Sequence, residues 1–329
     1  MKRGLVFGKF LPLHRGHQLM IETALSQVDD LTIVVYDSRR PGSERMPVEL
    51  RLGWLSELYP QAENILSLQD PLADDANADD PAHAEVYAGG VEFLGRFDRV
   101  FSSEPGYERF ADLLGATHIL VDEARTLVPT SGTVIRSDPY AYRGWMDPLV
   151  YSSLIERVVF VGTESTGKST LAERMAEELS TLWTHEFGRE LWEAQGLMGS
   201  FTDHLKMARR QRQREDAAAR HSRRYLFCDT NAWTTLHWSL RSYGTADARL
   251  FDLVDRTQGD YTWFLCANDF GWIQDGTREM AGAASAEFQE QQVRDLERRG
   301  IPYVTLTGSV EQRVQQVKGA LGAQAIATG

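Results

Sequence analysis

A glycine-rich segment in the second half of the chain has the residue types and spacing that suit phosphate binding. It runs from Gly162 to Ser169 (GTESTGKS), after an apolar run typical of a strand and before a pattern that predicts a helix over 169–179. Glycines let backbone N–H groups curl around a phosphate, and a helix N-terminus adds its positive end. Lys168 can supply charge to the β- and γ-phosphates of ATP, and the Ser169 hydroxyl can ligate Mg²⁺. We therefore predict a P-loop whose nucleotide-binding residues are Gly162, Glu164, Ser165, Thr166, Gly167, Ser169 and Thr170.

Two carboxylates in the same half suit phosphoryl transfer. Asp229 ends the apolar run 225–228, and an Asp beside a P-loop can hold Mg²⁺ or accept a substrate proton. Glu186 follows another strand pattern, where it can bind sugar hydroxyls or act as the base, and Arg189 can bind phosphate. A helix cap at Asp229 and an ion-paired helix start at Glu186 are the structural alternatives. Both carboxylates are candidates for the base.

Two further segments of this half carry arginines. Residues 272–278 (WIQDGTR) predict a loop with a glycine hinge, and Arg278 could close over the transferred phosphoryl group. A turn with solvated charges is the alternative. The run 206–224 is rich in arginine but has no interleaved aromatic residues for stacking on bases. We interpret it as the solvated face of an amphipathic helix.

Near the N-terminus, residues 8–17 (GKFLPLHRGH) follow the first predicted strand. His14 and His17 flank a glycine and open a predicted helix. Imidazoles placed there can donate hydrogen bonds to ATP phosphates while charge builds up on a pyrophosphate leaving group. A zinc pair is disfavoured because further Cys or His ligands at suitable spacing are lacking. The predicted site residues of this segment are Gly8, Lys9, Phe10, His14, Gly16 and His17.

Residues 130–136 (TSGTVIR) follow the same logic. Hydroxyl and N–H groups begin a helix, and Arg136 lies within its first two turns. This pattern predicts a second helix start that binds an anion. Ser131 and Thr133 are predicted to bind the nucleotide, and Arg136 to assist catalysis. An ordinary N-cap is the alternative for Ser131.

Short apolar runs alternate with helical patterns in both halves, which is typical of parallel sheets covered by helices. The expected fold is α/β with two domains, 1–150 and 151–329, each a parallel sheet flanked by helices. The segment 70–80, rich in Asp, Ala and Pro, predicts a solvated loop. Strands are predicted at 4–7, 31–36, 99–102 and 118–121, and near 157–161, 182–186, 224–229, 261–266 and 302–306, with early helices over 17–27 and 47–58.

Composition narrows the function classes. The 329 residues carry a formal net charge of −12, which argues against general binding to nucleic acid or to anionic membranes. No apolar run is long enough to span a bilayer, and the first strand begins at Leu5 without a signal peptide, so we expect a cytoplasmic protein. Cys228 and Cys266 lie in apolar runs and are expected to be buried, reduced thiols. Self-association is compatible with this composition.

The two N-terminal motifs together resemble the nucleotidyltransferase superfamily with HxGH and SxTxxR-like signatures. Here they stand as His14-Arg-Gly16-His17 and Ser131-Gly-Thr133-Val-Ile-Arg136. With the P-loop half, the chain resembles over nearly its whole length the bifunctional NadR type, in which nicotinamide mononucleotide (NMN) adenylyltransferase is followed by nicotinamide riboside kinase. Some members carry an N-terminal helix-turn-helix repressor domain. This chain starts three residues before the first strand, so we expect no such domain.

The resemblance implies two sequential reactions with ATP as substrate at both sites. In the second domain, nicotinamide riboside would be phosphorylated to NMN, with Lys168, Mg²⁺ held by Ser169 and Asp229, and Arg278 stabilising the transferred charge. In the first, a Rossmann-like domain, the NMN phosphate would attack the α-phosphate of ATP to give NAD and pyrophosphate. The implied catalytic residues there are Lys9, His14, His17 and Arg136.

Three other interpretations fit the same residues. The two folds could act on another nucleoside or phosphate acceptor, since motifs that bind ATP phosphates do not specify the acceptor. The first domain could instead sense nucleotides beside an active kinase. A regulatory or transporter-coupled role is the third alternative. Trp145 is a candidate for stacking on nicotinamide, with a core tryptophan as the alternative.

Overall fold

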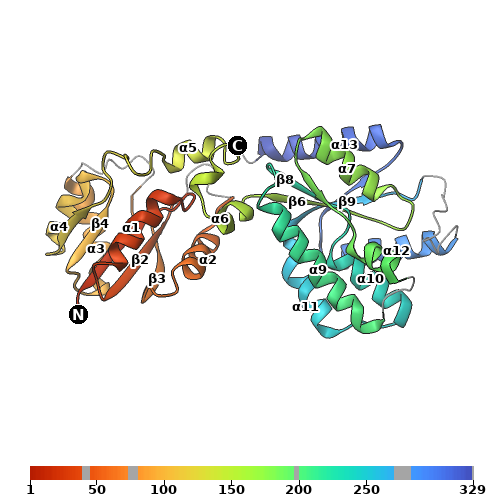
Figure 1. The fold of residues 1–329 in the computed structure, drawn as a ribbon, viewed down its shortest axis with the longest axis horizontal. Coiled ribbons are helices and arrows are strands. Elements are labelled where there is room, and N and C mark those ends of the chain that lie inside the picture. The colour runs from red at the N-terminus through yellow and green to blue at the C-terminus, as the bar shows by residue number, and fades with distance from the viewer. Residues whose placement is uncertain (39–44, 73–80, 196–199, 270–282, 328–329) are drawn as a thin grey trace. The chain divides into compact units, whose positions relative to one another are not determined.

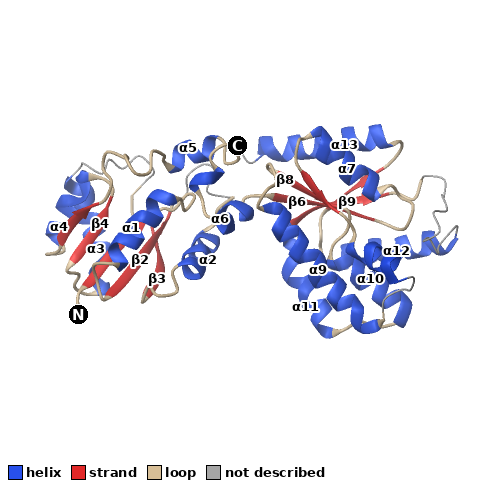
Figure 2. Cartoon of the chain, viewed as in Figure 1, coloured by secondary structure: helices blue, strands red, loops and turns tan. Residues whose placement is uncertain are grey.

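The computed structural model describes residues 1–38, 45–72, 81–195, 200–269 and 283–327. The chain divides into two compact units, one formed by residues 1–154 and the other by residues 155–327. Each unit contains a five-stranded sheet flanked by helices (Figures 1 and 2). We describe the two units separately.

All strand pairs of the first sheet are parallel, and its strands lie in the order β3-β2-β1-β4-β5. The chain runs outward from β1 to β3 and then continues on the other side of β1. The loops at the carboxyl ends of β1 and β4 therefore diverge, which is where open α/β sheets bind ligands. The strands are β1 (Arg3–Gly8), β2 (Asp30–Asp37), β3 (Asn64–Gln69), β4 (Arg99–Ser102) and β5 (Thr117–Leu120).

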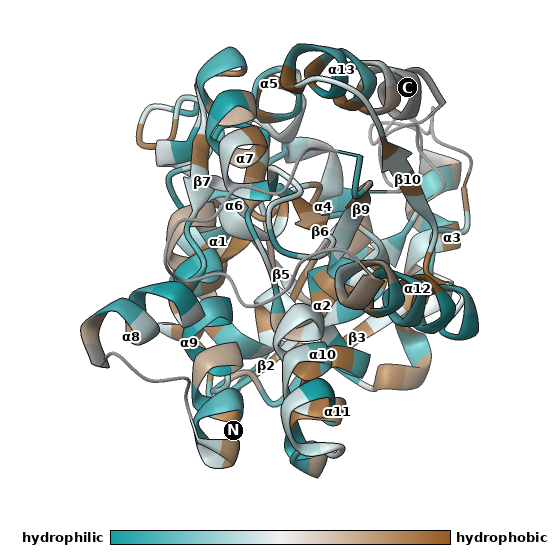
Figure 3. Ribbon diagram, turned by 90° about the vertical axis from the view of Figure 1, so that its right-hand side faces the viewer, coloured by the Kyte–Doolittle hydropathy of each residue, from teal (hydrophilic) through white to brown (hydrophobic). Residues whose placement is uncertain are grey.

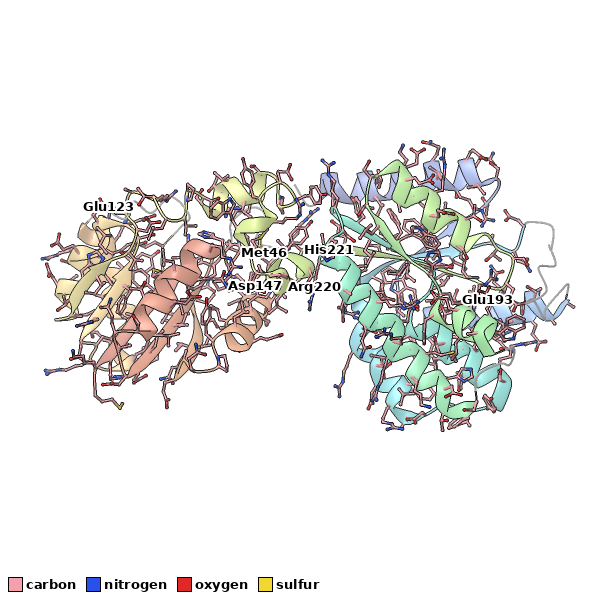
Figure 4. The ribbon with its side chains drawn as sticks, viewed as in Figure 1. Met46, Glu123, Asp147, Glu193, Arg220 and His221 are labelled. Carbon is pink, nitrogen blue, oxygen red and sulfur yellow. The ribbon has the colours of Figure 1, made fainter. Side chains whose placement is uncertain are left out.

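Apolar runs buried on both faces explain why the first sheet is parallel. Leu31 to Tyr36 of β2 are all buried, as are the middle residues of β1. Asp147, labelled in Figure 4, begins the last helix of the unit by accepting a 2.9 Å hydrogen bond from Leu149 N. The helices are α1 (Arg15–Leu25), α2 (Val48–Leu58), α3 (Pro81–Val91), α4 (Glu108–Leu113), α5 (Gly132–Ser137) and α6 (Pro148–Ser153), with 3₁₀ turns at Glu92–Leu94, Pro105–Tyr107 and Arg143–Trp145.

The second sheet is also parallel, with strand order β10-β9-β6-β8-β7. Figure 1 shows α7 and α13 on one face of this sheet and α9, α10 and α11 on the other. In Figure 3, α9 and α12 show hydrophilic stretches broken by hydrophobic residues, as expected for helices with one buried face. The strands are β6 (Glu156–Val161), β7 (Leu182–Thr184), β8 (Tyr225–Cys228), β9 (Tyr261–Cys266) and β10 (Tyr303–Leu306). The helices are α7 (Lys168–Glu178), α8 (Phe187–Gln195), α9 (Phe201–Ala219), α10 (Ala232–Tyr243), α11 (Ala248–Thr257), α12 (Ala283–Arg298) and α13 (Val310–Ala327), with a 3₁₀ turn at Gln258–Asp260.

The predicted parallel α/β architecture and the strands expected in both halves are confirmed. Strand β3 and helix α3 were not predicted, because β3 is partly exposed along its length and its apolar pattern is weak. Cys228 and Cys266 are buried, free thiols, as expected. The prediction of a solvated loop was wrong for Asp70, whose side chain is only 2% exposed and pairs with Lys9. Residues 73–80 of that segment lie outside the described residues.

The arginine-rich run forms the amphipathic helix that was predicted, with Arg209 and Arg210 exposed, and two of its other arginines form ion pairs. Arg214 forms a bidentate pair with Glu190 of α8, with N–O distances of 2.6 and 2.7 Å. Arg212 pairs with Asp260 at 2.7 Å and contacts the Tyr261 ring. These ion pairs lie within the unit, so Arg212 and Arg214 contribute to its local packing.

One fully buried carboxyl group of α9 gives the second unit a pH-dependent stability. Glu215 accepts a short hydrogen bond from the Tyr261 hydroxyl. Burial raises the pKa of Glu215 to about 7, although the Tyr261 hydrogen bond and the nearby arginines act in the opposite direction. Between the ordinary pKa of 4.5 and the raised pKa of about 7, Glu215 therefore keeps its proton in the folded state and has lost it in the unfolded state. This contribution to stability is present at low pH and is lost as the pH rises through 7.

We predict that Glu215→Gln removes this pH dependence, because the amide keeps an oxygen acceptor for Tyr261 and cannot ionise. Between pH 5 and 8 the wild-type protein should lose about 2 kcal/mol more unfolding free energy than the variant. Urea denaturation of both proteins at the two pH values measures this difference. Parallel pH dependences would contradict a protonated Glu215 in the folded state.

Candidate active sites

The P-loop connects β6 to α7 at the carboxyl edge of the second sheet. Gly162 has φ of 137°, and a Cβ atom there would lie 2.8 Å from the carbonyl oxygen of Cys266, so only glycine fits. Gly167 also has positive φ, 79°, where α7 begins. Lys168 Nζ donates a 2.7 Å hydrogen bond to the carbonyl of Thr163 in the same loop. The loop thus has the tight turns that backbone phosphate binding requires.

A pocket extends from this loop toward an acidic pair. Glu186 lines the pocket with the P-loop, and Asp229 follows β8 and is almost fully buried. The pKa values of both carboxyl groups are raised, mainly by burial, and the charge of Asp229 adds to the shift at Glu186. Lys168 and Arg189 oppose the shift at both groups. The predicted residues that line the pocket are Glu164, Ser165, Gly167, Lys168, Ser169, Thr170, Glu186 and Arg189.

Asp229 has a buried oxygen without a partner and lies near Ser169, the residue that follows the P-loop lysine. The Ser169 hydroxyl acts to lower the pKa of Asp229, against the larger effect of burial. The Oδ1 atom of Asp229 is buried without a hydrogen-bond partner. Magnesium sites of P-loop proteins use a Ser or Thr hydroxyl and an acidic residue together with substrate phosphates. Ser169 and Asp229 therefore fit a Mg²⁺ ion. No group of three or more His, Cys, Asp or Glu side chains suited to a metal ion occurs within the described ranges.

The far end of the pocket was not predicted from the sequence. It is lined by residues of α8, α9 and α10. Beyond Arg189 at the start of α8, the amphipathic patterns of these helices gave no signal of a site. The bidentate Glu190–Arg214 pair joins α8 to α9. The unpredicted lining residues are Gly188, Trp192, His204, Met207, Thr234, Thr235 and Trp238.

Helix α10 is anchored by a carboxylate from a distant part of the chain. Asp295 of α12 accepts hydrogen bonds from Trp233 Nε1 at 2.8 Å and from the His237 ring at 3.1 Å. Although burial alone would raise the pKa of Asp295, hydrogen bonds from His237, Arg299 and other donors hold it well below its usual range. The ionised carboxylate thus fixes the helix that presents Thr234 and Trp238 to the pocket.

In the first unit, the two histidines begin α1 directly after the loop from β1. His14 Nδ1 accepts a 3.1 Å hydrogen bond from Gly16 N, and His17 Nδ1 lies 3.4 Å from His14 N. Their rings stack with centroids 3.8 Å apart. Because an imidazole that accepts at Nδ1 carries its proton on Nε2 when neutral, this capping arrangement selects one tautomer.

The histidine pair is neutral at physiological pH. Burial lowers the pKa of His14 to about 4, with smaller contributions from the charges of Arg125 and Arg136. Burial and the neighbouring His14 lower the pKa of His17 well below its usual range. Phe10, buried with φ of 50°, packs its ring edge against His17 at 4.9 Å. The pair is therefore placed to donate hydrogen bonds as neutral imidazoles.

Arg136 connects the two N-terminal motifs. Its Nη1 donates a short hydrogen bond to the Leu11 carbonyl, and its Nη2 lies 3.1 Å from Thr133 Oγ1. Ser131 caps α5 by accepting from Val134 N at 3.3 Å. The N-cap that was the alternative for Ser131 is thus present, in a helix of only 6 residues, and nucleotide binding by Ser131 stays a prediction.

Lys9 and Arg125 complete the charged surroundings of this loop. Lys9 Nζ lies 2.9 Å from Asp70 Oδ2, an ion pair that the sequence did not predict. Arg125 has φ of 50° in the loop after β5 and adds positive charge near His14. Gly8 ends β1. Trp145 lies in a 3₁₀ turn and is partly buried.

Among the predicted site residues, Arg278 lies outside the described residues, and its role as a lid arginine stays a prediction. Within the part of the chain that the structure covers, no helix is both long and apolar enough to cross a membrane.

The fold and these sites define a two-unit α/β protein whose second unit has a P-loop kinase-like fold. A family model described as an AAA domain matches residues 157–313. The trifunctional NAD biosynthesis/regulator protein NadR of Escherichia coli (strain K12) is 30% identical over 322 residues, covering 92% of this chain and 78% of that protein. The chain belongs to the NadR family.

Two solved structures have the same fold. A NadR protein in complex with NR is 24% identical, with a TM-score of 0.59, and the match covers 94% of this chain and 91% of that one. A NadR protein in complex with NAD and AMP-PNP is 22% identical, with a TM-score of 0.58, and the match covers 97% and 95%. The similarity extends across both units.

The buried histidine pair leads to a stability prediction opposite in sign to that for Glu215. Because the folded-state pKa of His14 is below its ordinary value, its contribution is present above pH 6.5 and is lost as the pH falls toward 4. His14→Asn keeps a capping side chain without a group that titrates there. From pH 7.5 to 4.5, wild type should lose about 2 kcal/mol more unfolding free energy than the variant. Equal losses in urea titrations would show that His14 is not buried in its neutral form.

Proposed function

We propose that this chain is a bifunctional enzyme of NAD biosynthesis that uses ATP in both units. The second unit phosphorylates nicotinamide riboside to NMN, and the first transfers an adenylyl group from ATP to NMN. The observation that carries the proposal is the pocket that joins the P-loop lysine to the Glu186 carboxylate and then to an aromatic end. Relatives named for NAD biosynthesis, and NadR structures with NR and with NAD and AMP-PNP, support the substrates.

In the second unit, the acceptor hydroxyl attacks the γ-phosphate of ATP, the bond from the γ-phosphorus to the β,γ-bridging oxygen breaks, and ADP leaves. Lys168 and the P-loop N–H groups stabilise the charge on the phosphates, and Glu186 accepts the proton of the attacking hydroxyl. We assign this role to Glu186 because it lines the pocket, whereas Asp229 is not among the lining residues and lies near Ser169. A Mg²⁺ ion held by Ser169 and Asp229 would neutralise charge on the β- and γ-phosphates.

The aromatic end of the pocket suits the base of a nucleoside. Trp192 and Trp238 line this end, and the buried His204, whose pKa is lowered by burial, adds no charge near neutral pH. An acceptor with a flat cationic ring would be attracted to tryptophan rings. Nicotinamide riboside has such a ring.

In the first unit, the phosphate of NMN attacks the α-phosphate of ATP, and pyrophosphate leaves. His14 and His17 donate hydrogen bonds at the N-terminus of α1, where the helix end also favours negative charge. Lys9 and Arg136 supply cations beside the same loop. No covalent intermediate is needed, so positioning and charge stabilisation provide the catalysis.

We predict separable losses in the two units. Lys168→Ala should lower phosphorylation of nicotinamide riboside by about 100-fold or more, since it removes a cation that acts on the transferred group, and should leave conversion of NMN to NAD intact. His17→Ala should do the reverse. Initial rates of both reactions, measured for each purified variant, test this prediction. Loss of both activities in a folded single variant would contradict two independent sites.

The division of labour between the carboxylates gives a second prediction. Glu186→Gln should lower kcat for phosphorylation by about 100-fold with little change in the Mg²⁺ requirement, because it removes the proton acceptor. Asp229→Asn should raise the Mg²⁺ concentration needed for half-maximal rate. Rates measured across a Mg²⁺ titration separate the two effects. The opposite pattern would exchange the two roles.

The proposal as a whole is tested by incubating the protein with Mg·ATP and nicotinamide riboside and following NMN, NAD, ADP and pyrophosphate by chromatography. NMN followed by NAD supports both reactions and their order. NMN that accumulates without NAD would leave a kinase with a nucleotide-sensing first unit. Unused riboside, with NAD formed from added NMN, would mean that the second unit has another acceptor.

A further inference from the structure

Among the described residues, each unit contains a fully buried arginine that the proposed reactions do not use. Arg51 in α2 is 0% exposed and Arg313 in α13 is 1% exposed. A guanidinium group in the interior is unfavourable unless acceptors surround it, because it has five N–H donors and keeps its charge. The acceptors of these two residues therefore indicate what each arginine is there to hold.

Arg51 joins three segments at the carboxyl edge of the first sheet. Its Nη1 donates to the carbonyl of Lys9 at 2.7 Å and to that of Tyr36 at 3.0 Å. Its Nε donates to the carbonyl of Met46, labelled in Figure 4, at 2.9 Å. Its Nη2 pairs with Asp37 at 2.9 Å. Burial lowers the pKa of Arg51 from its usual value, and Asp37 opposes that shift.

Arg313 has the same kinds of partner in the second unit. Its Nη1 donates to the carbonyl of Thr166 in the P-loop at 2.8 Å. Its Nη2 donates to the carbonyl of Ala267, directly after β9, at 3.0 Å and pairs with Asp269. Its Nε donates to the carbonyl of Gly308 at 3.0 Å.

The two sets of contacts correspond although the units share no sequence motif. In both, Nε bonds to the carbonyl five residues earlier in the chain. In both, one terminal nitrogen bonds to the loop that follows the central strand, and another pairs with an Asp that ends a neighbouring strand or follows it by three residues. The loop held in this way is in each case the one predicted to bind ATP phosphates.

We propose that Arg51 and Arg313 are positioning residues that fix these two loops and thereby set the affinity of each unit for ATP. In a trans peptide, C=O and N–H point in opposite directions. Holding the Thr166 carbonyl in the interior therefore turns the Gly167 N–H to the other side of the loop, and Gly167 lines the pocket. Holding the Lys9 carbonyl orients the Phe10 N–H in the same manner.

This inference rests on the proposed function and deepens it, and each unit provides the control for the other. Arg313→Met should raise KM for ATP in phosphorylation about tenfold or more, because the hydrogen bonds donated by the charged guanidinium group are lost. The value of kcat should change much less. NMN-to-NAD conversion should keep its kinetic constants. Arg51→Met should give the reverse pattern. Arg174→Met, at an arginine 52% exposed on α7, is the surface control and should change neither reaction.

A purely structural role would give a different result. It would lower the amount of folded enzyme and hence the apparent kcat, with KM for ATP unchanged, and that result would overturn the proposal. If a Met variant does not fold, Arg→Lys provides the test, since a lysine keeps the charge but cannot bridge the same separate acceptors. Lysine variants with wild-type KM would also overturn it.

Hydrogen exchange tests the same inference without turnover. In the nucleotide-free protein, amides of residues 162–170 should exchange about tenfold faster or more in Arg313 variants, and those of residues 8–17 in Arg51 variants, because the lost hydrogen bonds leave the loop easier to open. Unchanged exchange in both loops would overturn the positioning role. A wild-type protein without either activity would instead refute the proposed function, and the exchange result would still stand.

Discussion

The hydrogen bonds of two parallel sheets determine where every candidate site in this protein lies. Parallel pairing aligns the carboxyl ends of the strands along one edge, so loops far apart in sequence meet there. The loop after β1 thus comes beside residues that follow β2, β3 and β5, and the P-loop comes beside residues that follow β7, β8 and β9. The chemistry depends on those loops holding one shape.

Burial then assigns the charge states. In the first unit it keeps two histidines neutral, and in the second it raises the pKa values of two carboxyl groups near a lysine. Both effects follow from removing ionisable groups from water, which disfavours the charged form of each group. The signs of the pKa shifts differ because the charged form of histidine is a cation and that of a carboxyl group is an anion. The cations that remain, including Lys168 and Lys9, are held by carbonyl or carboxylate oxygens.

The sequence predicted those parts of the fold and sites that local rules govern. Glycines with positive φ, histidines at a helix start and continuous apolar strands each follow from short-range geometry, and the structure contains them. It did not predict Asp70 beside Lys9, Asp295 beneath α10 or the tryptophans of the pocket. These depend on contacts between segments tens of residues apart, and an amphipathic helix pattern does not tell which partly buried residue faces a cavity. Arg51 and Arg313 were missed for the same reason, since a single arginine in a helix usually lies on the surface.

The two ends of the pocket are built from different parts of the second unit, and this determines which substitutions the pocket can accept. Phosphate chemistry resides in a loop whose backbone conformation tolerates almost no substitution, as the space around Gly162 shows. The opposite wall is built from side chains on α8, α9 and α10, and its rigidity comes from Asp295 and the Glu190–Arg214 pair behind it. Substitutions among the wall residues therefore leave both the loop and the anchors intact. Acceptor preference is therefore the property most open to redesign, while phosphate binding is the property most constrained by the geometry of its loop.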